Sequence, residues 1–262
     1  MFEDLSVDVT QVSPVALKTD FEAGVFLIDK PAGPTSFAMV RNLRRVLGIK
    51  KVGHAGTLDP FASGLLILCV GRSATKLISA FMQGEKEYLA TLCLGVETET
   101  LDPEGSVTKR CHFDRIEGVE IEHCLEGFRG SQQQVPPVYS ALKHKGRPLY
   151  YYARKGINII KDPREIFIRT LERTDGVQDL SGNEALLHLR VVCSKGTYIR
   201  TLAADIGRKL GCGAYLKELR RTRSGCFSVA QSLSGEIFSS HDARDQILNS
   251  ALSVEEACNL LQ

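Results

Sequence analysis

Apolar positions recur along the chain with two different spacings, and they predict a mixed set of strands and helices. Short apolar runs predict strands at 25–28, 65–70 and 88–94, and alternation of apolar with polar residues predicts a half-buried strand at 187–193. Helical spacing predicts helices near 36–47, 73–82 and 197–210. The two kinds of element do not alternate regularly enough for a doubly wound sheet, so the pattern favours the α+β class.

The first predicted helix combines an apolar stripe with basic residues. Ser36 is a suitable N-cap, and the stripe contains Phe37, Val40, Leu43 and Leu47. Arg41, Arg44 and Arg45 lie largely away from this stripe. The helix is therefore expected to present a basic face.

Composition is that of an ordinary globular protein. The 262 residues are 43% hydrophobic and 24% charged, and no apolar run approaches the roughly 18–20 residues that span a bilayer. The acidic N-terminus lacks the features of a signal peptide. Eight cysteines occur without any CxxC spacing, and several lie within apolar runs, which predicts reduced core thiols, a cytoplasmic setting and no metal site.

Charge is unevenly distributed along the chain. Residues 1–29 contain six acids and one lysine, and residues 232–262 contain five acids and one arginine, so the middle of the chain carries a large positive excess. Residues 127–161 hold seven Lys/Arg, no acid, and the run Tyr150-Tyr151-Tyr152. Long acid-free basic stretches with aromatic rings favour binding of nucleic acid.

The segment GHAGTLDPFASG, residues 53–64, is the most unusual stretch. Its glycines and Pro60 predict a compact loop that presents His54 and Asp59 among small residues. Asp59 is either a turn-forming or helix-capping residue or a carboxylate nucleophile held ionised by a cation. The segment CSKGTYIRT, residues 193–201, offers Arg200 in the first turn of a helix as that cation, but nothing in these residues alone joins the two segments.

Five segments, in order, resemble the TruB family, the bacterial tRNA pseudouridine-55 synthases. They are LIDKPAG at 27–33, GHAGTLDPFASG, KEY at 86–88, FRG with QVPPVYSALK at 128–143, and CSKGTYIRT continuing to Leu219-Arg220-Arg221. The resemblance covers residues 24–226, most of the chain. It implies an α+β catalytic fold with a mixed, mostly antiparallel sheet, flanking helices and a central RNA-binding cleft.

The resemblance also implies a reaction and its catalytic residues. Uridine 55 of the tRNA T arm becomes pseudouridine without cofactor or metal, and the target base is flipped out at a cost of a few kcal/mol. Asp59 matches the catalytic aspartate, and Arg200 matches the arginine that pairs with it. Tyr88 matches the tyrosine that stacks on the base and assists proton removal from C5. The resemblance leaves open whether the carboxylate attacks C1′, attacks the uracil ring or assists a glycal route.

Other matched residues are expected to bind substrate. His54 matches a histidine that holds the disrupted T loop, and Tyr198 and Leu219 match residues that line the uracil pocket. Lys30 and Pro31 match a motif that supports the cleft. The basic segment 127–161 matches an insertion that folds over the RNA.

The resemblance divides the chain into an acidic extension (1–23), a catalytic domain (24–230) and a short C-terminal tail (231–262) without a complete PUA domain. The expected partner is the tRNA T stem-loop, with no membrane, no obligate protein partner and a monomeric state. Two alternatives are a non-catalytic protein that binds and refolds the T arm, and a related pseudouridine synthase with another RNA target.

Overall fold

The computed structural model describes residues 21–176 and 178–261. The predicted acidic extension 1–23 therefore lies almost wholly outside the described residues. Within the described ranges, no helix is long and apolar enough to cross a membrane. The architecture is α+β, as the sequence predicted.

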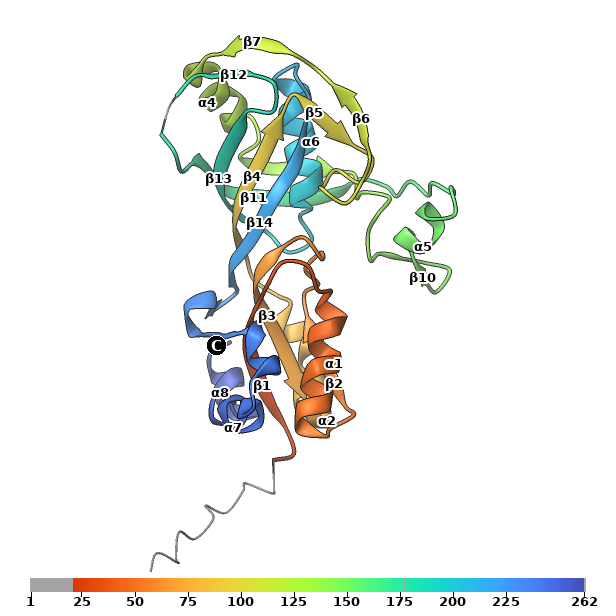
Figure 1. Cartoon of the computed structure of the whole chain (residues 1–262), viewed down its shortest axis with the longest axis vertical. Helices are drawn as coiled ribbons and strands as arrows, with labels where there is room; N and C mark the ends of the chain where they lie inside the picture. The colour runs from red at the N-terminus through yellow and green to blue at the C-terminus, as the bar shows by residue number, and fades with distance from the viewer. Residues whose placement is uncertain (1–20, 177, 262) are drawn as a thin grey trace, which may run out of the picture.

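A ten-stranded mixed sheet runs through the whole molecule (Figure 1). Its strand order is β16-β1-β3-β14-β4-β13-β11-β8, with β2 on β3 and β15 on β14. Pairing is parallel for β1 with β16 and for β3 with β14, and antiparallel elsewhere in the sheet. The strands are β1 (Gly24–Lys30), β2 (Val52–Ala55), β3 (Ser63–Val70), β4 (Lys86–Leu94), β8 (Gly130–Gln134), β11 (Arg164–Arg173), β13 (Leu186–Cys193), β14 (Ala214–Ser224), β15 (Phe227–Ser228) and β16 (Leu233–Ser234).

The described residues also form three two-stranded ribbons and eight α-helices. The ribbons are β5 (Val96–Thr98) with β6 (Val107–Arg110), β7 (Phe113–Ile116) with β12 (Leu180–Gly182), and β9 (Lys143–His144) with β10 (Arg147–Pro148). The helices are α1 (Ser36–Leu47), α2 (Gly71–Lys76), α3 (Ile78–Phe81), α4 (Gly118–Glu126), α5 (Leu149–Ala153), α6 (Ile199–Lys209), α7 (Ala243–Asn249) and α8 (Val254–Asn259), with 3₁₀ turns at Val229–Gln231 and Gly235–Ser239.

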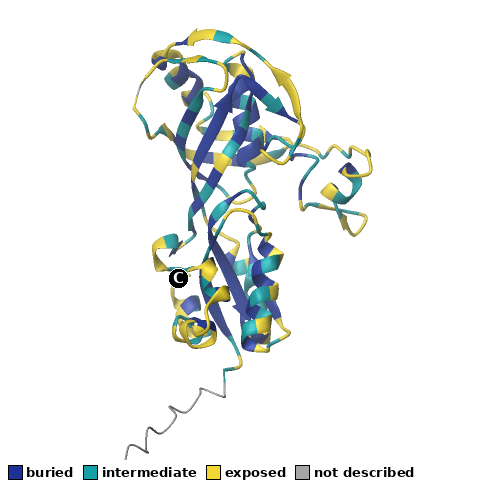
Figure 2. Ribbon diagram, in the orientation of Figure 1, coloured by how far each residue is buried: buried dark blue, intermediate teal, exposed yellow. Residues whose placement is uncertain are grey.

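The molecule has an upper and a lower lobe that share the sheet (Figure 1). In the upper lobe α4 and α6 cover one face, and their apolar residues join those of β4, β11, β13 and β14 in one buried cluster. In the lower lobe α1 and α7 bury one face of β1 and β3, and the other face packs with Phe81, Phe227 and Ala257. Buried residues accordingly follow the strands through both lobes (Figure 2).

The sequence pattern located the main elements and missed details of α1. The strands predicted at 25–28, 65–70, 88–94 and 187–193 are confirmed as β1, β3, β4 and β13, and the helix near 73–82 is divided into α2 and α3. Thr35, not Ser36, is the N-cap of α1, since its side chain accepts from the backbone N–H of Ala38. Phe37 is 58% exposed, and Met39 takes its predicted place in the buried stripe.

The C-terminal residues pack on the lower lobe. β16 pairs with β1, and Leu252 exchanges two backbone hydrogen bonds with Val25. Phe238 and Ile247 are buried in the cluster formed by α1, β1 and β3. The segment from residue 231 thus stabilises the strand that leads to the site.

Candidate active site

The loop that carries Asp59 joins β2 to β3, and it is held by the turn after β1 and the start of α1. We call residues 56–62 the Asp59 loop. Ser36 Oγ donates to the carbonyl oxygen of Leu58 at 2.8 Å and accepts from the Leu58 N–H at 2.9 Å. The Gly33 N–H donates to the carbonyl oxygen of Pro60 at 2.8 Å. These bonds fix the backbone on both sides of Asp59.

Lys30 supports the same loop from inside the protein. Its side chain is fully buried, and Nζ donates to the carbonyl oxygens of Pro31, Pro34 and Pro60 at 2.8, 2.8 and 3.1 Å. Burial lowers the pKa of Lys30 to about 8, and the nearby Asp59 carboxylate opposes that shift. Lys30 therefore supports the loop, the role that the sequence predicted for the Lys30-Pro31 motif.

Asp59 and Arg200 meet in the fold although 140 residues of sequence lie between them. Arg200 Nε lies 3.0 Å from Asp59 Oδ2. The Arg200 side chain is 5% exposed, whereas that of Asp59 is 37% exposed. The guanidinium is thus fixed inside the protein, and the carboxylate faces an accessible space.

Arg200 also holds a second carboxylate, which the sequence analysis missed. Its Nη1 lies 3.0 Å from Asp102 Oδ2, and the Asp102 side chain is only 3% exposed. Asp102 Oδ1 in turn accepts from Thr100 Oγ1 and from the Glu104 N–H. Asp102 stands before Pro103 in a stretch with the composition of an ordinary turn, so the sequence carried no signal for this contact.

Two backbone carbonyls complete the coordination of Arg200. Nη1 donates to Thr100 O at 3.0 Å, and Nη2 donates to Tyr139 O at 2.7 Å. A guanidinium with this many fixed acceptors keeps one orientation, and that orientation aims Nε at Asp59.

The protonation of Asp59 reflects opposing influences. Burial raises the pKa of the Asp59 carboxyl above its usual range, and the Asp102 carboxylate acts in the same direction. Arg200 and Lys30 act against this and favour the ionised form. Arg200 and Lys30 therefore stabilise the ionised form of Asp59 in this partly desolvated position.

Asp59, His54 and Arg200 line one cavity of about 720 Å³. Tyr150 and Arg154 also line it, and they belong to the arm, residues 135–163, which projects between β8 and β11 (Figure 1). Burial lowers the pKa of His54, and the Arg221 charge adds to this, so the imidazole is neutral at pH 7. The cavity has the size of a site for a small ligand or a single nucleotide.

The remaining predicted site residues lie close to this cavity but do not line it. Tyr88 on β4 is 8% exposed and shares a buried cluster with Leu219 and with Leu58 and Ala62 of the Asp59 loop. Burial raises the pKa of Tyr88 to about 12. The Asp59 loop, Tyr88 and Leu219 thus contribute to the same apolar core.

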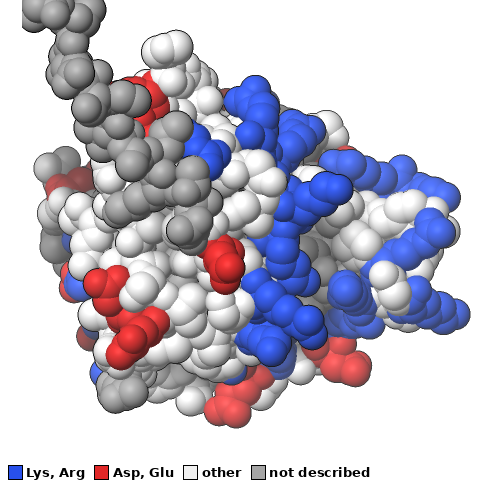
Figure 3. All heavy atoms as spheres, turned by 90° about the horizontal axis from the view of Figure 1, so that it is seen from below, with Lys and Arg blue, Asp and Glu red and all other residues white. Residues whose placement is uncertain are grey.

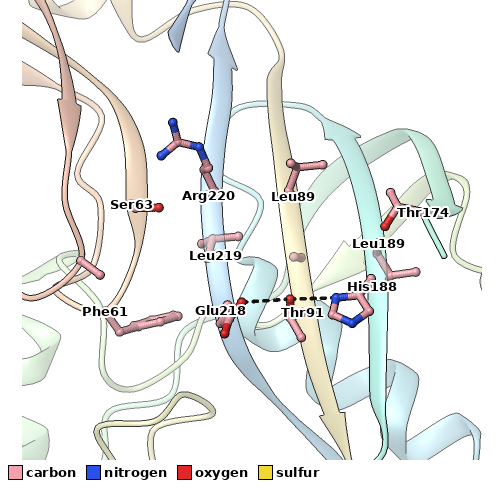
Figure 4. A pocket seen from close by; sticks show the side chains of 12 residues that line it. Phe61, Ser63, Leu89, Thr91, Thr174, His188, Leu189, Glu218, Leu219 and Arg220 are labelled. Carbon is pink, nitrogen blue, oxygen red and sulfur yellow. Dashed lines mark hydrogen bonds between the residues drawn. The ribbon is translucent and has the colours of Figure 1, made fainter. Parts of the chain in front are cut away.

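Leu219 lines a second cavity, of about 560 Å³, together with Phe61 (Figure 4). Thr91 lies at its floor, with His188 Nδ1 at 3.2 Å on one side and Glu218 Oε2 at 3.4 Å on the other. This cavity and the Asp59 cavity share no lining residue. The Asp59 loop contributes to both spaces, since Phe61 lines this cavity and Asp59 and Pro60 line the other.

Tyr198 is the N-cap residue of α6, two positions before Arg200. The Gln134 side chain accepts from the Tyr198 N–H at 2.8 Å and donates to the Tyr198 carbonyl at 3.0 Å. The Arg164 guanidinium lies 5.5 Å from the centre of the Tyr198 ring. Gln134 and Arg164 are paired residues of β8 and β11, so the base of the arm holds the start of α6.

Basic side chains gather on two facing parts of the surface. Seen from below, Lys and Arg form a ridge on the body of the molecule and crowd the arm beside it (Figure 3). The exposed members lie on α1 and the segment that follows it, on α2 and on the arm. They are Arg41, Arg45, Lys50, Lys51, Arg72, Lys76, Lys143, Lys145, Arg147, Arg154 and Lys155. Such a concentration attracts a polyanion.

The described residues contain no group of three His, Cys, Asp or Glu placed to hold a metal ion. All eight cysteines are unpaired, and five of them are buried. The polar groups at the Asp59 cavity are those of acid–base and carboxylate chemistry.

Comparisons with known proteins agree with one another. The family model described as TruB family pseudouridylate synthase, N-terminal domain, matches residues 44–199, and the tRNA pseudouridylate synthase B C-terminal domain matches residues 200–255. The tRNA pseudouridine synthase B of Desulfotalea psychrophila is 60% identical over 93% of this chain and 98% of its own length. That of Protochlamydia amoebophila is 47% identical over 81% of this chain and 78% of its own length.

A solved structure also matches. In the crystal structure of a Cbf5-Nop10-Gar1 complex, one chain superposes with a TM-score of 0.66 at 28% identity over 90% of this chain. This chain spans 62% of the length of that one. The matches to the family models and the 60% identity over nearly the whole length lead to the same conclusion: this chain belongs to the TruB family of pseudouridylate synthases.

Proposed function

We propose that this protein is a tRNA pseudouridine synthase that isomerises uridine 55 of the T arm, with Asp59 as its essential carboxylate. The observation that carries the proposal is the ion pair of Asp59 with the buried Arg200 at 3.0 Å, at the wall of a cavity of about 720 Å³. Membership of the TruB family supports the reaction class.

The reaction rearranges bonds without changing the composition of the RNA. The N1–C1′ bond breaks with its electron pair on the uracil, the base turns, and a C5–C1′ bond forms. C5 then loses its proton, and N1 takes up a proton, so no proton is gained or lost overall. The balance is redox-neutral and needs no co-substrate. The ionised Asp59 acts on the electron-poor centre of the substrate, Arg200 keeps that carboxylate ionised and aimed, and Tyr88 stacks on the base and assists removal of the C5 proton.

The RNA binds across the facing basic surfaces. The target base leaves the folded T loop and enters the cavity, and neutral His54 occupies space beside it. Contacts of the basic ridge and the arm with phosphates supply most of the affinity, so binding falls steeply with salt. Tyr198 and Leu219 line the pocket for the uracil.

The proposal extends to the cellular compartment and the oligomeric state of the protein. We place the protein in the cytoplasm, where eight unpaired thiols stay reduced. It acts there as a monomer on the T stem-loop, without a metal, a cofactor or an obligate protein partner.

The test uses an unmodified tRNA transcript labelled with tritium at uridine C5. We expect the wild type to release tritium with pseudouridine at position 55, and Asp59→Asn to release none while binding the RNA within a few-fold. The control is Asp205→Asn, a partly exposed aspartate on α6 that pairs with Arg208 and should keep full activity. Tight binding without release would favour the non-catalytic T-arm binder, and modification elsewhere would favour another RNA target.

A further inference from the structure

Arg221 on β14 is a buried arginine directly beneath the Asp59 loop. It is 2% exposed. Its Nε donates to the carbonyl oxygen of Leu65 at 2.8 Å, and its Nη2 donates to that of Gly56 at 2.9 Å. Gly56 begins the Asp59 loop and Leu65 follows it in β3, so one guanidinium ties together the two ends of the segment that carries Asp59.

The register of the sheet places Arg221 between the loop and Tyr88. β14 lies between β3 and β4, and Arg221 is opposite Gly64 on one side and opposite Tyr88 on the other. Residues opposite each other on neighbouring strands lie side by side on one face. Arg221 is therefore a direct structural link from the loop to the tyrosine.

Two glycines show how closely Arg221 approaches the loop. Gly64 has φ +102°, and a Cβ there would lie 2.3 Å from the Arg221 carbonyl oxygen. Gly56 has φ +82°, and a Cβ there would lie 3.2 Å from Arg221 Nη1. Both the backbone conformation and the contact favour glycine at these positions.

The charge of Arg221 has no carboxylate partner among the described residues. Its neighbours Arg200, Arg220 and Arg223 all form ion pairs, and Arg221 does not. Burial of an unpaired guanidinium is unfavourable for folding, so an apolar residue would be the simpler choice for stability alone. The charge opposes the upward pKa shift of Tyr88 and contributes to the downward pKa shift of His54.

We propose that Arg221 is a positioning residue of the active site: its guanidinium holds the Asp59 loop over Tyr88 and so sets the Asp59 carboxylate against Arg200. This inference rests on the proposed function. It assigns to Arg221 an effect on the chemical step and none on the affinity for RNA, because the side chain is covered by the loop.

Single-turnover rates with enzyme in excess over tritium-labelled T-arm RNA test the inference, since they report only folded, RNA-bound enzyme. Arg221→Met removes both hydrogen bonds and should slow the step about 100-fold, the loss expected for a displacement near 1 Å, while the Kd for RNA changes less than about threefold. Arg221→Lys keeps a donor and a charge and should fall between Met and wild type. The matched control is Arg223→Met, whose side chain is 35% exposed and faces Glu87, and it should react at the wild-type rate.

A wild-type rate in Arg221→Met would overturn the inference. So would a slow rate that follows weakened RNA binding and recovers at saturation. If Arg221→Met does not fold, Arg221→Lys decides alone: a reduced rate at unchanged Kd supports the role, and the wild-type rate refutes it. Absence of tritium release from the wild type would instead count against the proposed function itself.

Discussion

Replacement of Arg200 by methionine is expected to destabilise the protein as well as to abolish activity. The guanidinium lies between two carboxylates of different exposure, 37% for Asp59 and 3% for Asp102. Asp59 can be hydrated when its partner is lost, but Asp102 cannot. The main effect on folding therefore comes from Asp102, left as an unpaired buried charge.

The size of the effect follows from this geometry. Removal of one partner of a buried ion pair costs about 3–5 kcal/mol. In a protein of this length 1 kcal/mol shifts Tm by about 2–4 °C, so Arg200→Met should lower Tm by about 6–20 °C. Adding Asp102→Asn should restore more than half of the lost stability, because the amide is neutral and its oxygen still accepts from Thr100 and Glu104.

The free energy of unfolding of each variant is measured by urea unfolding, monitored by far-UV circular dichroism because the chain contains no tryptophan to report by fluorescence. The two single variants, the double variant and the wild type form a double-mutant cycle. Arg208→Met is the control: it lies on the same helix, is exposed and pairs with Asp205, and should change stability by less than about 0.5 kcal/mol. Additive losses in the double variant, or a loss below about 1 kcal/mol in Arg200→Met, would refute the reasoning.

Three further predictions concern other contacts. Gln134→Leu breaks both hydrogen bonds to Tyr198 and should slow single turnover at least about tenfold. The control, Gln133→Leu, changes an exposed neighbour and should react at the wild-type rate. Equal rates for the two variants would show that the hydrogen bonds of Gln134 to Tyr198 are dispensable. Asp59→Asn should be more stable than wild type at pH 7, because the raised pKa of Asp59 means that folding disfavours the ionised carboxylate. This gain in stability should vanish below about pH 4, where the carboxyl is protonated in the unfolded state as well. Urea unfolding midpoints of both proteins at the two pH values test the direction of the effect. Phe238→Ala should lose about 3–5 kcal/mol, and a loss under about 1 kcal/mol would mean that the C-terminal segment adds little to the lower lobe.

Strands and helices of strong periodicity were predictable because their signal is local. Residues 65–70 form a continuous apolar run, and residues 88–94 are apolar except for Thr91. The structure buries all of these residues except Leu89. The exposure of Phe37 was not predictable, since it depends on a tertiary contact: Ser36 turns inward to bind Leu58, and this leaves Phe37 facing the cavity. From helical spacing alone, an apolar residue such as Phe37 is predicted to be buried.

The sequence predicted the role of a site residue only where that residue lies in a recognised family motif. Asp59 and Arg200 were identified through family resemblance, and the fold brings them to 3.0 Å. Asp102 was missed because it is a single polar residue in an ordinary turn. Gln134 and Arg221 lie in segments that match the family, but the resemblance gave neither residue a role. Their partners are 98, 64 and 165 residues away, so only the folded chain reveals their contacts.

The position of β14 has a consequence for how the protein is made. This strand is near the middle of the sheet, yet it comes from residues 214–224, late in synthesis. Until it leaves the ribosome, β3 and β4 have no partner on the sides that β14 will join, and such open edges invite mispairing with other chains. The same strand brings Leu219 and Arg221, so the active site of a nascent chain is complete only after β14 has joined β3 and β4.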